Sequence, residues 1–207
     1  MEALLLRVLP ALACLAGMLL CSRRLVHFLQ LESYQLPGFF RTLKRDWLQA
    51  VLPGGVLAAA CFALTTVSVA LGVRWLALVQ VAAVAGLTAY FLLTWRKEKA
   101  KKPLVITARV KRLFGAMGLL MGVLTLLCAC LSSLSLARAL IALLPALLPL
   151  WVVLGALLAW PMEKLISQLY LRQAKQLLAE RPDLIRVGIT GSYGKTSVKF
   201  ILGTILR

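Results

Sequence analysis

The residues best suited to chemistry in this 207-residue chain stand together at positions 190–197, where the sequence is TGSYGKTS. Gly191 and Gly194 can take backbone conformations that a side chain would obstruct. Such a loop can direct several backbone N–H groups at one phosphate group, and the start of a following helix adds partial positive charge. Lys195 supplies a cation for the outer phosphates of a nucleotide, and the Thr196 hydroxyl can bind Mg²⁺. The predicted chemistry is phosphate binding.

A loop of this kind needs a strand before it and a helix after it, and the flanking residues predict both. Residues 184–190 have a short buried-strand pattern, and the helix expected from Lys195 onward has apolar side chains on one face. The general pattern G-x-x-x-x-G-K-[ST] would place glycine where this chain has Ile189. A glycine turn before an unrelated helix is therefore the alternative interpretation.

The stretch GITGSYGKTS (188–197) resembles the ATP-binding loop of the Mur ligase family, which has the pattern T-G-x-x-G-K-[TG]-[ST]. Within that family it looks most like the branch that adds D-alanyl-D-alanine to the muramyl tripeptide. Two features carry this likeness: Ser192 follows the first glycine, and the motif ends in GKTSVK (194–199). The stretch 161–199 also looks like a membrane-anchored subgroup of Mur ligases found in Gram-positive bacteria.

The resemblance implies an ATP-dependent ligase of peptidoglycan synthesis that joins a peptide carboxylate to an amine. In the family, ATP phosphorylates the carboxylate, and the amine then displaces phosphate to form an amide. The implied cofactors are ATP and Mg²⁺, and the implied partners are the muramyl-peptide precursor and D-alanyl-D-alanine. A different lipid-linked or polyglutamate-type acceptor is the alternative, because membrane spans stand where the family has its UDP-sugar domain. The resemblance implies Lys195 as catalytic residue, Thr196 as metal ligand, and an ATP loop of Thr190, Gly191, Ser192, Tyr193, Gly194, Lys195, Thr196 and Ser197.

The composition of the whole chain is that of a membrane protein. Hydrophobic residues make up 61% of it and charged residues 15%, and the mean hydropathy is +0.90. The net charge of +17 would also fit a nucleic-acid partner, but the basic residues flank apolar runs, as they do beside membrane spans. We therefore expect contact with the lipid bilayer and no nucleic acid. The five cysteines lack the spacing of a metal site and are predicted to be small packing residues.

Five apolar runs are long enough to cross a bilayer, which takes about 20 residues. The first could instead be a signal peptide, but Glu2 precedes it and Arg23 and Arg24 follow it, which reverses the usual charge order. Asp, Glu and Lys are absent from the depths of all five runs, which favours an anchor over a transporter or channel. The predicted spans are residues 3–21, 50–73, 75–95, 113–134 and 139–160, with tight turns at 72–74 and 135–138.

The distribution of Lys and Arg predicts how these spans are oriented. Segments 22–49 and 96–112 and the tail after residue 160 hold 5, 8 and 8 of the 24 basic residues, which makes 21. The N-terminal segment and the two tight turns hold the other 3. Five spans place the three basic segments on one side of the membrane, and the Lys/Arg excess marks the cytoplasmic side. The prediction is a multi-pass protein of the bacterial cytoplasmic membrane, with its N-terminus outside and its C-terminus in the cytoplasm.

The predicted fold is an all-α membrane domain of five transmembrane helices followed by the first strand, phosphate loop and helix of an α/β ATP-binding domain. Residues 1–160 form the membrane domain, 161–182 an amphipathic helix beside the membrane, and 183–207 the start of the ATP-binding domain. We expect this last domain to be incomplete at Arg207, with further ligase residues downstream and the 207-residue chain itself inactive. Residues 25–31 and 39–47 predict short interfacial helices, with His27 on the surface.

Finer features of the spans carry their own predictions. Pro145 and Pro149 predict a kink in the fifth span, because proline cannot complete the helical hydrogen-bond ladder. Gly118 and Gly122 form a G-x-x-x-G spacing that permits close approach of another helix.

Two other functions fit parts of the sequence. A membrane structural or scaffold protein would carry a terminal phosphate loop that has no function. A transporter subunit with its own nucleotide-binding domain is the third possibility, but an ABC-type domain would have the loop G-x-x-G-x-G-K-[ST] and an upstream aromatic residue. The reading frame beyond Arg207 separates the ligase from both.

Overall fold

The computed structural model of the protein describes residues 2–73, 75–97, 103–131, 133–181, 187–191 and 193–206. Within these residues the regular structure is helical, and no β-strand is present. The chain forms two compact units, Met1–Glu163 and Lys164–Arg207.

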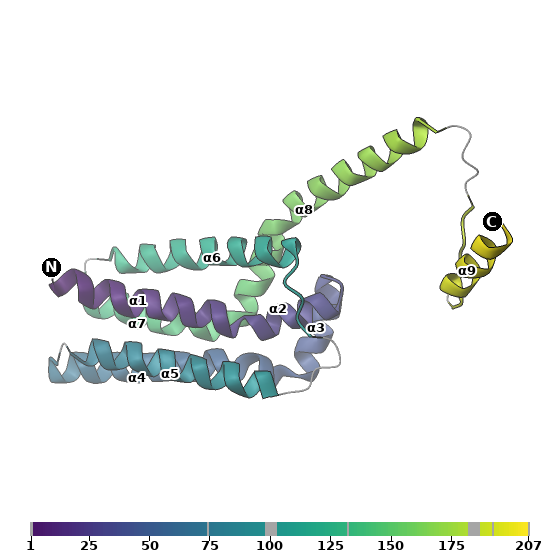
Figure 1. Ribbon diagram of the computed structural model, residues 1–207. Coiled ribbons are helices and arrows are strands. Elements are labelled where there is room, and N and C mark those ends of the chain that lie inside the picture. Colours follow the sequence, from purple (N-terminus) through teal and green to yellow (C-terminus); the bar gives the residue numbers. More distant parts are fainter. Residues whose placement is uncertain are drawn as a thin grey trace. The chain divides into compact units, whose positions relative to one another are not determined.

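The first unit is a bundle of membrane-length helices (Figure 1). Five segments are long and apolar enough to cross a membrane: Val8–Leu31, Trp47–Leu71, Leu76–Trp95, Ala108–Ala129 and Ser135–Ala179. The predicted number of spans is therefore confirmed, and the chain is a multi-pass membrane protein by length and composition of its helices. The elements are α1 (Glu2–Cys21), α2 (Arg23–Leu31), α3 (Leu36–Arg45), α4 (Trp47–Leu71), α5 (Leu76–Lys97), α6 (Ala108–Ala129), α7 (Leu134–Leu143), the 3₁₀ helix η1 (Leu144–Leu147) and α8 (Leu148–Ala179).

Helix α1 runs through the middle of this bundle. It packs against α5 on one side and against α6 and α7 on the other, and α4 lies against α5 and α7 (Figure 1). The fully buried side chains at the centre are large and apolar, among them Met18, Leu57, Met117 and Leu148. Leucine and valine side chains also cover the outside of α4, α5 and α6, where Leu119 and Leu126 are exposed. A surface this apolar fits contact with lipid and would aggregate in water.

Two polar contacts connect the helices at one end of the bundle. The Gln30 side chain, at the end of α2, donates to the Val105 carbonyl at 2.9 Å and accepts from the Val105 N–H at 3.2 Å. The Arg112 side chain donates to Glu163 of α8 at 2.6 Å. These contacts join the end of α2 to residue 105 and the start of α6 to Glu163 of α8.

The fourth and fifth spans begin earlier than the sequence predicts. Helix α6 covers 108–129 instead of 113–134, because Thr107 caps it by accepting from the Val110 N–H at 3.3 Å. The link to the next helix lies at 130–133, before the predicted turn at 135–138. Arg138 is consequently inside α7 and buried, and its predicted placement in the tight turn at 135–138 was wrong. The predicted kink in the fifth span is confirmed, since Pro145 stands in the 3₁₀ segment between α7 and α8.

The two predicted short helices form as α2 and α3, but α2 lies within the first membrane-length segment, and both helices bury apolar side chains in protein. Helix α2 follows α1 after Ser22 alone and buries Leu25, Val26 and Leu29. The prediction of a surface position for His27 was wrong: its side chain is only 5% exposed, and its ring lies 6.1 Å from that of Trp95. The physical reason is that the α2 face carrying these residues turns toward the bundle.

Close helix contacts occur at glycines other than the predicted pair. A Cβ atom on Gly118 or Gly122 would only reach ordinary van der Waals distance, 3.9 to 4.0 Å, from leucines of α1. A Cβ on Gly54 would overlap the Pro145 carbonyl oxygen, and one on Gly155 would overlap the Met117 side chain. The tight packing of the bundle is therefore α4 against η1 and α8 against α6.

The second unit contains the end of α8 and the helix α9 (Lys195–Ile205). Helix α8 runs through Pro161 without a break, so the helix predicted for 161–182 is the continuation of the fifth span. Proline removes one hydrogen bond from the helical ladder, and helices of membrane proteins tolerate this loss because other groups can satisfy the freed carbonyl. The helix ends at Ala179, three residues before the predicted end at 182, and Pro182 cannot extend it because the residue before a proline disfavours the helical conformation. Of the strand predicted for 184–190, residues 184–186 lie outside the described residues, and 187–190 have no regular structure. A strand needs a pairing partner, and the described residues provide none.

Candidate functional site

The predicted phosphate loop has the backbone conformation that its glycines make possible. Gly194 is the N-cap of α9 with φ +78°, and Gly191 has φ +148°. Both values lie where a residue with a side chain is rarely found. Helix α9 begins at Lys195, so the change from loop to helix falls where the sequence predicts it. Ser192 lies outside the described residues.

The start of α9 offers unoccupied donors. The N–H groups of a helix's first turn have no partner within the helix, and Gly194 has no side chain to cap them. The first turn carries no acidic residue, so Lys195 adds positive charge to the helix end. A Cβ atom on Gly194 would enter open space, which leaves room for a ligand against the backbone. Thr190, Tyr193, Lys195, Thr196 and Ser197 are all exposed.

These residues offer some of the groups that a nucleoside triphosphate with Mg²⁺ requires. Backbone donors and one lysine suit phosphate oxygens, which are hydrogen-bond acceptors with negative charge. For Mg²⁺ the loop offers a single protein ligand, the Thr196 hydroxyl. The ion prefers to keep several waters and to bind substrate phosphates with few protein groups, so one hydroxyl is consistent with a nucleotide-bound ion.

The helix after the loop has an apolar face without cover in its unit. Its side chains Val198, Ile201 and Ile205 are 48%, 59% and 72% exposed. In an α/β domain such a face packs on a sheet. The described residues of the predicted ATP loop, 190–191 and 193–197, are therefore exposed, but the described residues do not form the sheet that would support them.

Comparison with known proteins adds no relative. No protein-family model, curated protein or solved structure matches the chain.

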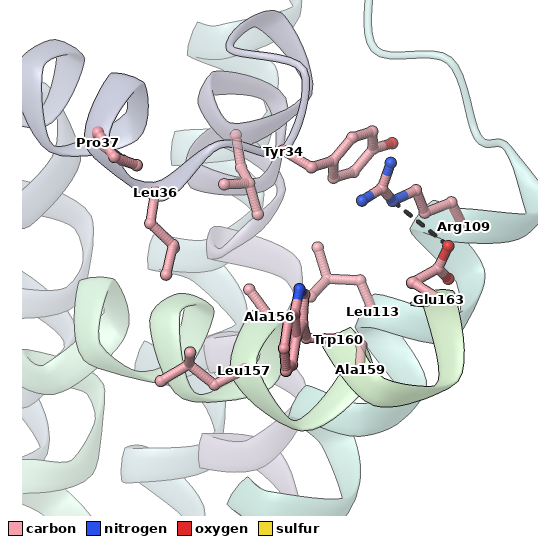
Figure 2. Close-up of a pocket in the computed structure, with 11 residues that line it drawn as sticks. Tyr34, Leu36, Pro37, Arg109, Leu113, Ala156, Leu157, Ala159, Trp160 and Glu163 are labelled. Carbon is pink, nitrogen blue, oxygen red and sulfur yellow. Dashed lines mark ion pairs between the residues drawn. The ribbon is translucent and has the colours of Figure 1, made fainter. Parts of the chain in front are cut away.

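A second candidate site, which the sequence did not predict, is a cavity of about 430 Å³ in the first unit (Figure 2). It lies where α2, the α2–α3 turn, α3, α6 and α8 come together. Most of its wall is apolar, with Leu29, Leu36, Leu113 and Leu157 among the lining residues. Its polar side chains are Tyr34, Arg109 and Glu163, and the ring of Trp160 stands beside them.

The polar part of this cavity has one basic and one acidic side chain, Arg109 and Glu163. Glu163 receives two guanidinium groups, with Arg112 Nε at 2.6 Å and Arg109 Nε at 3.5 Å. The Arg109 guanidinium also lies 4.0 Å from the centre of the Tyr34 ring, a cation–π contact visible in Figure 2.

The turn that carries Tyr34 has an unusual backbone. Ser33 and Tyr34 have φ of 53° and 62°, and neither residue is glycine. Left-handed conformations of this kind cost roughly 1–2 kcal/mol per residue for a residue with a side chain. The turn is held by backbone bonds, with the Tyr34 N–H donating to the Leu29 carbonyl at 2.8 Å. Strain at a cavity wall is a feature of binding sites more than of plain packing.

The other end of the bundle holds a buried arginine. Arg138 is 8% exposed, and its guanidinium donates to the Ser68 hydroxyl at 3.1 Å and to the Gln80 side-chain oxygen at 3.4 Å. These bonds join α7 to α4 and α5. One local signal of this burial was available: Arg138 is the fifth residue of an apolar helix whose start can be recognised from Ser133 as its cap. The cavity offered no such signal, because its residues come from distant segments.

Proposed function

We propose that the chain is the membrane-anchoring part of an ATP-dependent ligase of the Mur type, acting at the bacterial cytoplasmic membrane. The observation that carries the proposal is the loop of positive-φ glycines, Gly191 and Gly194, directly ahead of a helix that starts with Lys195 and Thr196. This order of conformations and residue types is what phosphate binding at a helix start requires.

In the proposed reaction the loop holds ATP while its terminal phosphoryl group is transferred to a peptide carboxylate. The N–H groups at the start of α9 bind phosphate oxygens, and the Lys195 ammonium balances the charge that gathers on the transferring group. The Thr196 hydroxyl is one ligand of the Mg²⁺ that accompanies ATP. The muramyl tripeptide and D-alanyl-D-alanine are the proposed substrates, on the likeness of the motif.

The five membrane-length helices support the anchoring role. Their exposed surface is apolar, and the basic segments 22–49 and 96–112 gather at one end of the bundle. We propose that this end faces the cytoplasm, since cytoplasmic loops carry the Lys/Arg excess. The loop at 190–197, which follows the fifth span, would then meet cytoplasmic ATP.

The test uses the product of the complete reading frame in membranes, supplied with ATP, Mg²⁺, muramyl-tripeptide precursor and D-alanyl-D-alanine. The expected result is ADP release that depends on both substrates. Lys195→Ala should lower the rate by about 100-fold or more, the size of effect seen when one group that stabilises the transition state is removed.

Lys199→Ala is the matched control, because Lys199 is an exposed lysine one turn further along α9. It should keep the wild-type rate. Equal rates for Lys195→Ala and wild type, or no substrate-dependent ADP release, would refute the ligase and favour a membrane scaffold with a loop that has no function. ADP release with a polyglutamate-type or lipid-linked acceptor, but not with the muramyl tripeptide, would keep the reaction class and change the substrate.

A further inference from the structure

We infer that the cavity between α2, α3, α6 and α8 binds an anionic phospholipid, with its phosphate group at Arg109 and its first chain carbons against the leucines. The inference uses no residue of the loop at 190–197, so it stands or falls independently of the proposed ligase.

The first argument is the accessible positive charge of Arg109. Its Nε lies 3.5 Å from the Glu163 carboxylate, a loose ion pair, and 44% of its side chain is accessible. Its guanidinium therefore has donors available to a ligand. Guanidinium groups bind phosphate in a planar, two-bond arrangement, which makes a phosphate the favoured anion.

The second argument is a polar atom that lacks a partner. The hydroxyl oxygen of Tyr34 is buried and makes no hydrogen bond with the described residues. Burying a hydroxyl without a partner costs about 1–3 kcal/mol, and the left-handed backbone at Ser33 and Tyr34 adds to that cost. The Arg109 guanidinium lies against the Tyr34 ring at one side of the cavity (Figure 2), so a phosphate that draws the guanidinium off the ring would bring a ligand oxygen within reach of this hydroxyl.

The third argument distinguishes a lipid from a free anion. The cavity is lined mainly by leucine, alanine and proline, and its volume of about 430 Å³ is that of a small-molecule site. An inorganic phosphate would leave this apolar space empty, whereas the chain of a lipid would fill it.

The position of the cavity along the first and fourth membrane-length segments also favours a lipid phosphate. Its polar residues stand where the apolar segments end: Tyr34 follows the span Val8–Leu31, and Arg109 is in the first turn of the span starting at Ala108. Trp160 follows the apolar run of α8, and tryptophan is enriched at the head-group level of membranes. The head group of a lipid entering from the bilayer would thus meet the charged residues, and its chain would meet the apolar wall.

The experiment is native mass spectrometry of the whole chain in detergent, titrated with phosphatidylglycerol and, separately, with zwitterionic phosphatidylcholine. Wild type should retain one phosphatidylglycerol and bind it in clear preference to phosphatidylcholine. Arg109→Gln should weaken phosphatidylglycerol binding by about tenfold or more, the effect of losing one charge-assisted hydrogen bond. Lys111→Gln is the control, since it removes an exposed positive charge two residues away on the same helix and does not line the cavity.

Tyr34→Phe separates binding from folding. Because the hydroxyl has no partner in the described chain, its loss should leave the melting temperature unchanged or raised, while phosphatidylglycerol binding weakens by about twofold to tenfold. Tyr90→Phe, which removes the hydroxyl of an exposed tyrosine, should change neither quantity.

A third variant, Ala156→Leu, fills the cavity and should abolish retention of phosphatidylglycerol, whereas Ala59→Leu on the exposed side of α4 should not.

Three results would overturn the inference. One is equal phosphatidylglycerol binding by wild type, Arg109→Gln and Tyr34→Phe. Another is displacement of the lipid by inorganic phosphate at equal concentration, which would indicate a site for a free anion. The third is a dimer that Ala156→Leu disrupts, which would indicate that a second copy of the chain occupies the cavity.

Discussion

The adjacent glycines Gly54 and Gly55 of α4 provide a sharp test of how the bundle packs. A Cβ atom on Gly54 would overlap the backbone carbonyl oxygen of Pro145 and lie 3.0 and 3.1 Å from two carbons of Leu148. A Cβ on Gly55 would have no atom within 4 Å. Because the first overlap involves backbone, rotation of a side chain cannot relieve it. Alanine at position 54 must therefore push η1 away from α4.

The expected magnitudes follow from these two environments. Replacing a glycine inside a helix by alanine stabilises the fold by about 0.5–1 kcal/mol, and both variants share that gain. Gly54→Ala additionally overpacks a tight contact, which costs about 1–3 kcal/mol. The free energies of unfolding of the two variants should therefore differ by about 1–3 kcal/mol, or about 5- to 150-fold in the equilibrium constant.

The measurement is reversible unfolding of the chain in mixed micelles with increasing dodecyl sulfate, followed by tryptophan fluorescence. Gly55→Ala should unfold at or slightly above the wild-type detergent fraction, and Gly54→Ala clearly below it. Equal free energies of unfolding for the two variants would refute the close approach of α4 to η1. A lower stability for Gly55→Ala than for Gly54→Ala would refute the assignment of which face of α4 is buried.

Two further predictions concern the opposite end of the bundle and its orientation. Gln80→Leu removes an acceptor from the buried Arg138 guanidinium and should lower the free energy of unfolding by about 1–3 kcal/mol in the same assay. Adding Arg138→Met should recover part of that loss, because the unpaired charge is then removed as well. Additive effects of the two changes would show that the pair is not coupled. The orientation can be tested in a chain whose five cysteines are replaced by alanine. A membrane-impermeant thiol reagent should label Ser135→Cys from outside the cell and leave Arg45→Cys unlabelled, since both positions are exposed and lie at opposite ends of the bundle. The reverse pattern would overturn the orientation with the N-terminus outside.

Much of the architecture could be predicted because it depends on local composition. An apolar run of about 20 residues has few stable choices in a membrane protein other than a helix, so the five spans and their number were accessible. The start of α9 at Lys195 and the positive φ of Gly191 and Gly194 were accessible for a similar reason, since glycine placement before Lys-Thr is a local signal. Local sequence alone could not decide whether the predicted strand at 184–190 forms, because a strand needs a pairing partner.

The span boundaries show where charge misleads. Arg109, Lys111 and Arg112 favoured a fourth span starting at 113, yet all three stand in the first turns of a helix capped by Thr107. A basic residue ends an apolar run but not a helix, because its long side chain can reach polar surroundings from a helical backbone. In the same way Pro161 marked the predicted start of a new helix, whereas α8 passes through it.

By itself the sequence determined the membrane character of the chain, its number of spans and the position of the loop that could bind phosphate, because each depends on neighbouring residues. Only the tertiary structure decided that His27 and Arg138 are buried, that Gly54 and Gly155 are the points of closest approach, and that Tyr34, Arg109 and Glu163 line one cavity. Tyr34 and Glu163 are separated by 129 positions, and nothing in their local sequence specifies that they meet. They come together because helix packing, which buries one face of each helix against several others, sets the rotation and depth of every span at once.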